Sequence, residues 1–206
     1  LSILALAAML EGKEKYEIVD GNVDPDPTST MLRIMAEHRV EMVGVTVMPG
    51  PQMASAIAPS AAIHQKHPNV PIVWGGYFPS LYSDCALNVP YVTYVARGQG
   101  EDTLTELLGA IRGERSLDSI RGLSYRRADG THQHNPERVM QSPDTFPWYP
   151  YHRLDPEKYL RPSFFGRRTV AHQASIGCPF QCSFCGVISA FGSREKFETP
   201  ERTESI

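Results

Sequence analysis

Short apolar runs alternate with amphipathic stretches along the first half of the chain. The runs are rich in β-branched residues and do not alternate in polarity, which is typical of strands covered on both faces of a sheet. They predict strands at 16–20, 42–48, 70–74 and 91–96. Between them the spacing predicts helices at about 28–38, 52–66 and 80–87, and the apolar opening, 1–10, predicts a buried helix.

One further helix carries the clearest apolar stripe of the chain. The stripe consists of Leu104, Leu107, Leu108 and Ile111. Thr103 and Glu106 match a capping box ahead of the stripe, and Gly113 can end the helix. Pro59 is expected to kink or split the earlier helix in which it lies.

Alternation of strands and helices with short links predicts an α/β fold, a doubly wound parallel sheet of flavodoxin-like type. Open sheets of this kind bind ligands at the carboxyl ends of their strands. The loops expected there read "DGNVDPDP", "MPGPQ", "GGYFPS" and "RGQGED". All are rich in glycine or proline, which suits close approach to an extended ligand but also simple turns.

The pattern changes after this alternating region. Residues 122–134 predict a hairpin that turns at Asp129 and Gly130. Residues 142–168 are rich in proline, aromatic and basic side chains without periodicity, which indicates a linker packed against its neighbours. Its aromatic residues Trp148, Tyr149 and Tyr151 either close over a cofactor or only anchor the linker.

A new unit is expected to start near Thr169, with a strand in "TVAHQAS" and a helix that begins at Thr199 and Pro200. So short a unit cannot enclose a core. We therefore expect a fragment in three parts: 1–140, an α/β domain that lacks its first strand; 141–168, a linker; and 169–206, the truncated start of a second domain.

Composition narrows the class of partner and the cellular setting. A formal net charge of −3 predicts no attraction to nucleic acid, so small molecules are the expected partners. The apolar opening is too short for a membrane span and has no basic flank. Of four cysteines, three lie within eight residues and Cys85 lies apart, which indicates no disulfide framework and fits a reducing, cytoplasmic setting.

Cys178, Cys182 and Cys185 form a C-x3-C-x2-C array. A structural zinc site needs four ligands, and His172 is the only nearby candidate for the fourth. A redox dithiol would use one C-x2-C pair and leave Cys178 over. Three thiolates on a four-iron cluster would leave one iron open to an exchangeable ligand.

The stretch "GCPFQCSFC", with Phe184 before its last cysteine, resembles the cluster loop of the radical S-adenosylmethionine superfamily. The resemblance implies that the three cysteines hold a 4Fe-4S cluster in a partial TIM-type (β/α) barrel that begins here. It also implies that S-adenosylmethionine binds the fourth iron and is cleaved reductively to a 5′-deoxyadenosyl radical, with an electron donor such as flavodoxin or ferredoxin.

Upstream, "VWGGYFPSLYSD", "YVTYVARGQGEDTLTELLGAI" and "IRGLSYRRADG" resemble the cobalamin-binding domain that precedes this barrel in one branch of the superfamily. The resemblance places Thr46, Gly75, Gly76, Gly98 and Glu101 near the corrin or its nucleotide tail. Gln99 stands where glutamate is frequent in that branch. No histidine has aspartate two positions before it, so no Asp-x-His-x-x-Gly cobalt ligand is expected.

The function implied is methylation of an unactivated carbon or phosphorus, or a radical ring closure as in anaerobic porphyrin cyclases. Two alternatives remain. The first is a radical enzyme whose first domain has lost cobalamin. The second is a zinc- or cluster-stabilised binding protein with a flavodoxin-like or receiver-like domain, which Asp20 at the end of a predicted strand could suggest. The 206 residues alone are expected to be inactive, and they indicate neither the catalytic residues nor the substrate.

Overall fold

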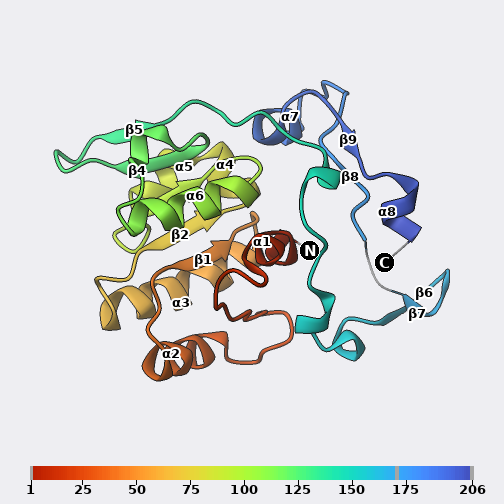
Figure 1. Ribbon diagram of the computed structural model, residues 1–206, viewed down its shortest axis with the longest axis horizontal. Helices are drawn as coiled ribbons and strands as arrows, with labels where there is room; N and C mark the ends of the chain where they lie inside the picture. Colours follow the sequence, from red (N-terminus) through yellow and green to blue (C-terminus); the bar gives the residue numbers. More distant parts are fainter. Residues whose placement is uncertain (1, 170–171, 205–206) are drawn as a thin grey trace.

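The computed structural model describes residues 2–169 and 172–204 (Figure 1). Its centre is a five-stranded sheet in the order β1-β2-β3-β4-β5. The strands are β1 (Val43–Thr46), β2 (Ile72–Gly75), β3 (Tyr94–Ala96), β4 (Leu123–Arg126) and β5 (His132–His134). The first three run parallel, and β4 and β5 continue antiparallel. The predicted α/β class is confirmed, and so is the predicted hairpin at residues 122–134.

Helices cover both faces of this sheet. In chain order they are α1 (Ser2–Leu10), α2 (Pro27–Glu37), α3 (Pro51–Lys66), α4 (Tyr77–Leu81), α5 (Ser83–Leu87) and α6 (Glu101–Ile111). Apolar residues of α2, α3 and α5 share one core cluster with the sheet, and α6 contributes to a second cluster on the other face. The sheet is therefore doubly wound, as its continuous apolar strands require.

Strand β2 shows how the two clusters are separated. Ile72 and Trp74 point into the cluster under α2, α3 and α5, whereas Val73 between them points into the cluster under α6. All three side chains are buried. Because successive side chains of a strand point to opposite faces, an apolar run of this kind serves two cores at once.

The strand predicted at 16–20 is wrong, because these residues form no strand. They pack against the linker instead: Arg153 lies over the ring of Tyr16 at 5.0 Å, and the Tyr159 hydroxyl donates to the Asp20 carboxylate over 3.0 Å. Side-chain contacts with residues more than 130 positions away replaced the backbone pairing that the apolar pattern suggested.

The helix predictions need three further corrections. The helix expected at 80–87 is two short helices, α4 and α5, which meet at Tyr82. The capping box is wrong, since α6 begins at Glu101 and the buried Thr103 hydroxyl donates to the Arg121 carbonyl. Pro59 does not split α3, which is continuous from 51 to 66; Pro59 is itself buried, so packing offsets the lost backbone bond.

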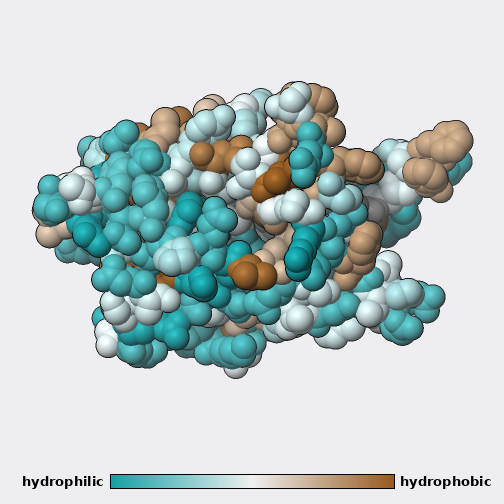
Figure 2. Space-filling view, turned by 90° about the horizontal axis from the view of Figure 1, so that it is seen from above, coloured by the Kyte–Doolittle hydropathy of each residue, from teal (hydrophilic) through white to brown (hydrophobic). Residues whose placement is uncertain are grey.

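The segment 141–168 contains more regular structure than its composition predicted. It begins with three short 3-10 turns, at Pro143–Thr145, Tyr151–Arg153 and Pro156–Lys158. A similar turn, Leu117–Ser119, precedes β4. It ends in an antiparallel hairpin of β6 (Arg161–Ser163) and β7 (Gly166–Thr169). Phe164 and Phe165 at the hairpin turn are 98% and 92% exposed, and Figure 2 shows brown surface at this end of the molecule.

The last part of the described chain carries the cysteines. Its elements are β8 (Ser175–Ile176), α7 (Val187–Phe191), β9 (Lys196–Phe197) and α8 (Pro200–Glu204). The strand predicted in 169–175 is shorter than expected, pairs antiparallel with β9, and falls partly at 170–171, outside the described residues. Thr199 begins α8 as predicted, with its hydroxyl 3.4 Å from the Arg202 N–H.

No helix within the described residues is long and apolar enough to cross a membrane.

Candidate functional site

The carboxyl ends of the three parallel strands meet at one edge of the sheet. Thr46 ends β1, Gly75 ends β2, and Gly98 follows β3 by two residues. Figure 1 shows this edge turned toward the linker and the cysteine-containing unit. The topology thus brings together Thr46, Gly75, Gly76 and Gly98, four of the five residues predicted near the corrin. The fifth, Glu101, lies three positions beyond Gly98.

Gly76 is the tightest point of this edge. Its φ is +95°, and a Cβ there would lie 3.1 Å from the Thr46 hydroxyl and from both polar backbone atoms of Val47. The Val47 N–H donates to the Gly75 carbonyl over 2.8 Å. Only glycine combines this left-handed backbone with so close an approach of two loops.

Ser80 joins the loops that follow β2 and β3. Its hydroxyl donates to the Gly76 carbonyl over 2.7 Å and accepts from the Gly98 N–H over 2.9 Å. Ser80 was not among the predicted site residues. The available signal was a serine four positions after a glycine that opens a helix, which is where a side chain can bond back to the backbone.

Glu101 lies in the first turn of α6. Burial raises the pKa of its carboxyl, and the neighbouring charge of Asp102 raises it further, against backbone N–H donors from Gly100 and its own residue. Burial, then the charges of Glu101 and Glu198, raise the pKa of Tyr149 to about 12. The linker does meet the start of α6 at Gln141, whose side-chain amide donates to the Asp102 carboxylate over 2.6 Å.

The three cysteines lie on the loop between β8 and α7. Cys182 is exposed, Cys178 and Cys185 are partly exposed, and all are free thiols. The Cys185 N–H donates to the Cys182 carbonyl over 3.1 Å. Across the described residues no three His, Cys, Asp or Glu side chains converge closely enough for a metal ion. The donor set fits an iron–sulfur cluster in kind and number, but the loop does not hold the thiols in a ligating arrangement.

Glycines hold both ends of this loop against neighbouring elements. A Cβ at Gly177, whose φ is +90°, would collide with the Arg194 carbonyl. A Cβ at Gly186 would lie 2.7 Å from the Tyr77 hydroxyl, on α4. The loop therefore starts against the stretch before β9 and ends against α4, the helix that follows Gly75 and Gly76.

Helix α7, which follows the loop, packs on that edge. The Ala190 carbonyl lies 3.2 Å from where a Cβ of Gly98 would be, and the rings of Tyr77 and Phe191 are 6.5 Å apart. The two regions singled out from the sequence, more than 70 residues apart, are thus direct neighbours.

Phe180 and Phe184 on the cysteine loop are 71% and 91% exposed. Large apolar side chains this exposed are unusual on a protein surface, and here two of them flank cysteines of the array.

His172 is engaged with protein partners on both ring nitrogens. Its Nε2 lies 2.6 Å from the buried Glu198 carboxylate, and its Nδ1 lies 3.4 Å from the Tyr151 hydroxyl. This arrangement does not support His172 as a fourth zinc ligand.

Asp20 likewise has a local role. Its carboxylate accepts from the backbone and side chain of Asn22 and from Tyr159. It does not end a strand, so the receiver-like alternative has lost the observation that suggested it.

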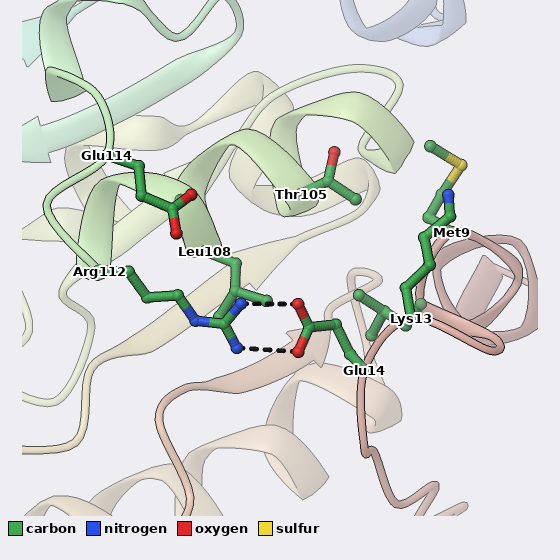
Figure 3. Close-up of a pocket in the computed structure, with 9 residues that line it drawn as sticks. Met9, Lys13, Glu14, Thr105, Leu108, Arg112 and Glu114 are labelled. Atoms are coloured by element: carbon green, nitrogen blue, oxygen red, sulfur yellow. Dashed lines mark hydrogen bonds and ion pairs between the residues drawn. The ribbon is translucent and has the colours of Figure 1, made fainter.

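A shallow pocket of about 230 Å³ lies away from these residues, between the carboxyl ends of α1 and α6 (Figure 3). Arg112 crosses it and binds both carboxylate oxygens of Glu14, at 2.6 and 2.8 Å. Since α6 begins at the glycine-rich edge and runs away from it, this pocket is not part of the candidate site.

Residues 1–108 match the family described as "B12 binding domain". The chain belongs to this family. The match includes all five residues predicted near the corrin and ends before the cysteines.

An uncharacterised methyltransferase of Pyrococcus horikoshii is 29% identical over 204 residues, covering 98% of this chain and 43% of that protein. An anaerobic magnesium-protoporphyrin IX monomethyl ester cyclase of Synechocystis is 29% identical over 142 residues, covering 68% and 28%.

A solved structure of the radical S-adenosylmethionine methyltransferase TsrM from Kitasatospora setae, with cobalamin and a [4Fe-4S] cluster bound, is also similar. It aligns with a TM-score of 0.73 and 22% identity over 99% of this chain and 41% of that one. This chain therefore spans less than half the length of these relatives. The resemblance of this chain to cobalamin-dependent radical S-adenosylmethionine enzymes is confirmed.

Proposed function

We propose that this chain belongs to a cobalamin-dependent radical S-adenosylmethionine enzyme. One observation carries the proposal: the glycine-rich edge of a sheet that belongs to the B12-binding family lies next to the unit with the C-x3-C-x2-C loop. Gly98 lies against Ala190 of α7, and Tyr77 of α4 lies against Gly186 at the end of the loop. A reaction that uses two cofactors in turn requires their sites to be close.

Each region supplies a different kind of binding. Gly75, Gly76 and Gly98 let backbone approach a large flat ligand, while Thr46 and Glu101 offer polar side chains to its edge or tail. Cys178, Cys182 and Cys185 would hold three irons of a cluster and leave the fourth for S-adenosylmethionine. When bound, these groups supply a methyl-carrying corrin and a strong one-electron reductant.

The reaction class is methyl transfer to an unactivated centre or radical cyclisation of a small molecule. Both occur among the relatives, since one is named a methyltransferase and another a cyclase at the same 29% identity. The proposal includes an external electron donor such as flavodoxin or ferredoxin and a cytoplasmic setting. It also includes the division into 1–140, 141–168 and 169–206.

The first test is the absorption spectrum of the full-length gene product, reconstituted with iron and sulfide without oxygen, incubated with hydroxocobalamin and desalted. We expect a corrin band together with broad iron–sulfur absorption. Cys182→Ser should lose the iron–sulfur absorption and keep the corrin band. Cys85→Ser, a cysteine on α5 outside the loop, should keep both.

Iron–sulfur absorption without a retained corrin band would contradict the cobalamin part and support a radical enzyme with a repurposed first domain. Loss of the cluster in both cysteine variants, or in neither, would contradict the assignment of the loop. Methyl-labelled S-adenosylmethionine then separates the two reactions: label in the product indicates methylation, and an unlabelled, ring-closed product indicates cyclisation.

A further inference from the structure

Helix α4 lies between the two regions of the candidate site. It begins immediately after Gly75 and Gly76, and its other side packs on α7, directly after the cysteine loop. It has only five residues, 77–81, so the contacts on its two sides are made by the same or immediately neighbouring residues.

On the sheet side, α4 is fixed to all three edge loops. Its Phe78 N–H donates to the Val47 carbonyl over 3.1 Å, and Ser80 bonds to both Gly76 and Gly98. A ligand that presses on any of these loops therefore acts on α4 directly.

On the cysteine side, α4 meets Gly186, the residue directly after Cys185. A Cβ at this position would be 2.7 Å from the Tyr77 hydroxyl and 2.8 Å from a methyl group of Leu81. The backbone at Gly186 thus rests on α4 without spare room, and close-packed contacts of this kind transmit displacement instead of absorbing it.

We propose that Tyr77 is a positioning residue that couples occupancy of the glycine-rich edge to the arrangement of the cysteine loop. This inference rests on the proposed function. Corrin bound at the edge would fix α4, and the Tyr77 ring, held against Phe191 and Gly186, would hold the end of the loop that carries Cys182 and Cys185. Ordering by one ligand lowers the cost of ordering by the other.

The coupling must be reciprocal, because it is a free energy shared by two sites. Protein that holds the cluster should bind cobalamin more tightly than protein without it, by the same factor by which cobalamin favours the ligating form of the loop. Coupling factors of this kind are typically about fivefold or more.

The experiment measures alkylation rates of individual cysteines in the full-length, cluster-free protein, with and without saturating cyanocobalamin. Mass spectrometry of the peptides resolves each site, and the exposed Cys85 serves as internal reference. We expect cyanocobalamin to slow alkylation of Cys182 and Cys185 about fivefold or more and to leave Cys85 unchanged.

Tyr77→Ala should abolish this protection while retaining cyanocobalamin binding. Tyr82→Ala, which removes an exposed ring at the end of the same helix, should keep it. Tyr77→Phe keeps the ring and removes only the hydroxyl next to Gly186, and it should show less protection than wild type. If circular dichroism shows that the alanine variant is unfolded, the phenylalanine variant tests the coupling in its place.

Bound cyanocobalamin that leaves the rates of Cys182 and Cys185 unchanged would overturn the coupling and leave the proposed function standing. So would equal protection in wild type and in both Tyr77 variants. Failure of the wild-type protein to bind cyanocobalamin would overturn the proposed function itself, and the coupling with it.

Discussion

Gln99 is a buried side chain whose amide pairs with one backbone residue of the linker. Its Oε1 accepts from the Gln141 N–H over 2.8 Å, and its Nε2 donates to the Gln141 carbonyl over 3.3 Å. The side chain is only 6% exposed. A glutamate carboxylate could accept the first bond but could not donate the second. The pairing with Gln141 therefore explains why glutamine, and not glutamate, fits this position.

Gln99→Glu is therefore expected to destabilise the protein by about 1–3 kcal/mol, because it leaves a buried carbonyl unpaired and buries a charge. Urea unfolding followed by circular dichroism measures the change. Gln65→Glu on the exposed face of α3 is the matched control and should cost a few tenths of a kcal/mol. Equal costs for the two variants would show that the Gln141 pairing contributes nothing.

Glu101 gives a prediction about pH. Burial, followed by the charge of Asp102, raises the pKa of Glu101 in the folded protein above its ordinary value of 4.5. The folded state then holds the proton more tightly than the unfolded state, so ionisation disfavours folding. The penalty is absent below pH 4.5, grows as the pH rises to the raised pKa, and stays constant above it.

Glu101→Gln should thus raise the melting temperature of the cofactor-free protein at pH 7 and leave it unchanged at pH 4. Thermal unfolding at both pH values tests this. Glu17→Gln, at an exposed position, should change neither. A lower melting temperature for Glu101→Gln at pH 7 would mean that the carboxylate is stabilised by the first turn of α6.

At the scale of elements, α3 and β2 are held together by a polar contact inside an apolar core. The Trp74 indole N–H donates to the Ser60 hydroxyl over 3.0 Å, and this hydroxyl donates to the Ala56 carbonyl over 2.7 Å. Both side chains are buried. The serine lets a large aromatic ring fill the core without an unpaired donor.

Ser60→Ala should cost about 1–3 kcal/mol because the indole N–H loses its partner in the core. Ser55→Ala on the same helix is the control, since the exposed Ser55 hydroxyl also bonds back to a carbonyl, that of Pro51. Denaturant titration with tryptophan fluorescence follows both variants. A cost for Ser55→Ala as large as that for Ser60→Ala would refute a specific role of the Trp74 contact.

At the scale of the whole molecule, the segment 141–168 is attached at several separate places. Gln141 pairs with Gln99, Arg153 binds Glu11 at 2.9 Å, and Tyr159 bonds to Asp20. Arg202 of α8 donates to the carbonyls of Phe146 and Pro147 over 2.7 and 2.9 Å and lies over the Trp148 ring. The segment thus joins the sheet and the cysteine-containing unit along its length.

Arg202→Lys should loosen the attachment of α8 and β9, because one ammonium group cannot reproduce the fork of a guanidinium. We expect the opening free energy reported by hydrogen exchange of the Glu198 N–H, which bonds to the Ala174 carbonyl, to fall by about 1–3 kcal/mol. Arg167→Lys on the exposed β7 strand should leave it unchanged. Unchanged exchange in Arg202→Lys would show that other contacts hold α8.

Local patterns in the sequence were sufficient for the parallel strands, for most of the helices and for the hairpin at 122–134. Apolar β-branched runs, the 3.6-residue period and an Asp-Gly turn are physical properties of neighbouring residues, so they can be read without the fold. The cysteine spacing and the glycine-rich loops were readable in the same way and led to the family.

Tertiary contacts decided what local patterns could not. The run at 16–20 has a strand-like composition, but contacts with Arg153 and Tyr159 hold it away from the sheet. Gln99, Ser80 and Tyr77 gained their roles from partners 18 to about 110 positions away, and no local signal specifies such partners. The sequence by itself determined which elements form and which chemistry is available; packing determined that the glycine-rich edge and the cysteine loop meet, because contact between distant segments depends on the whole fold.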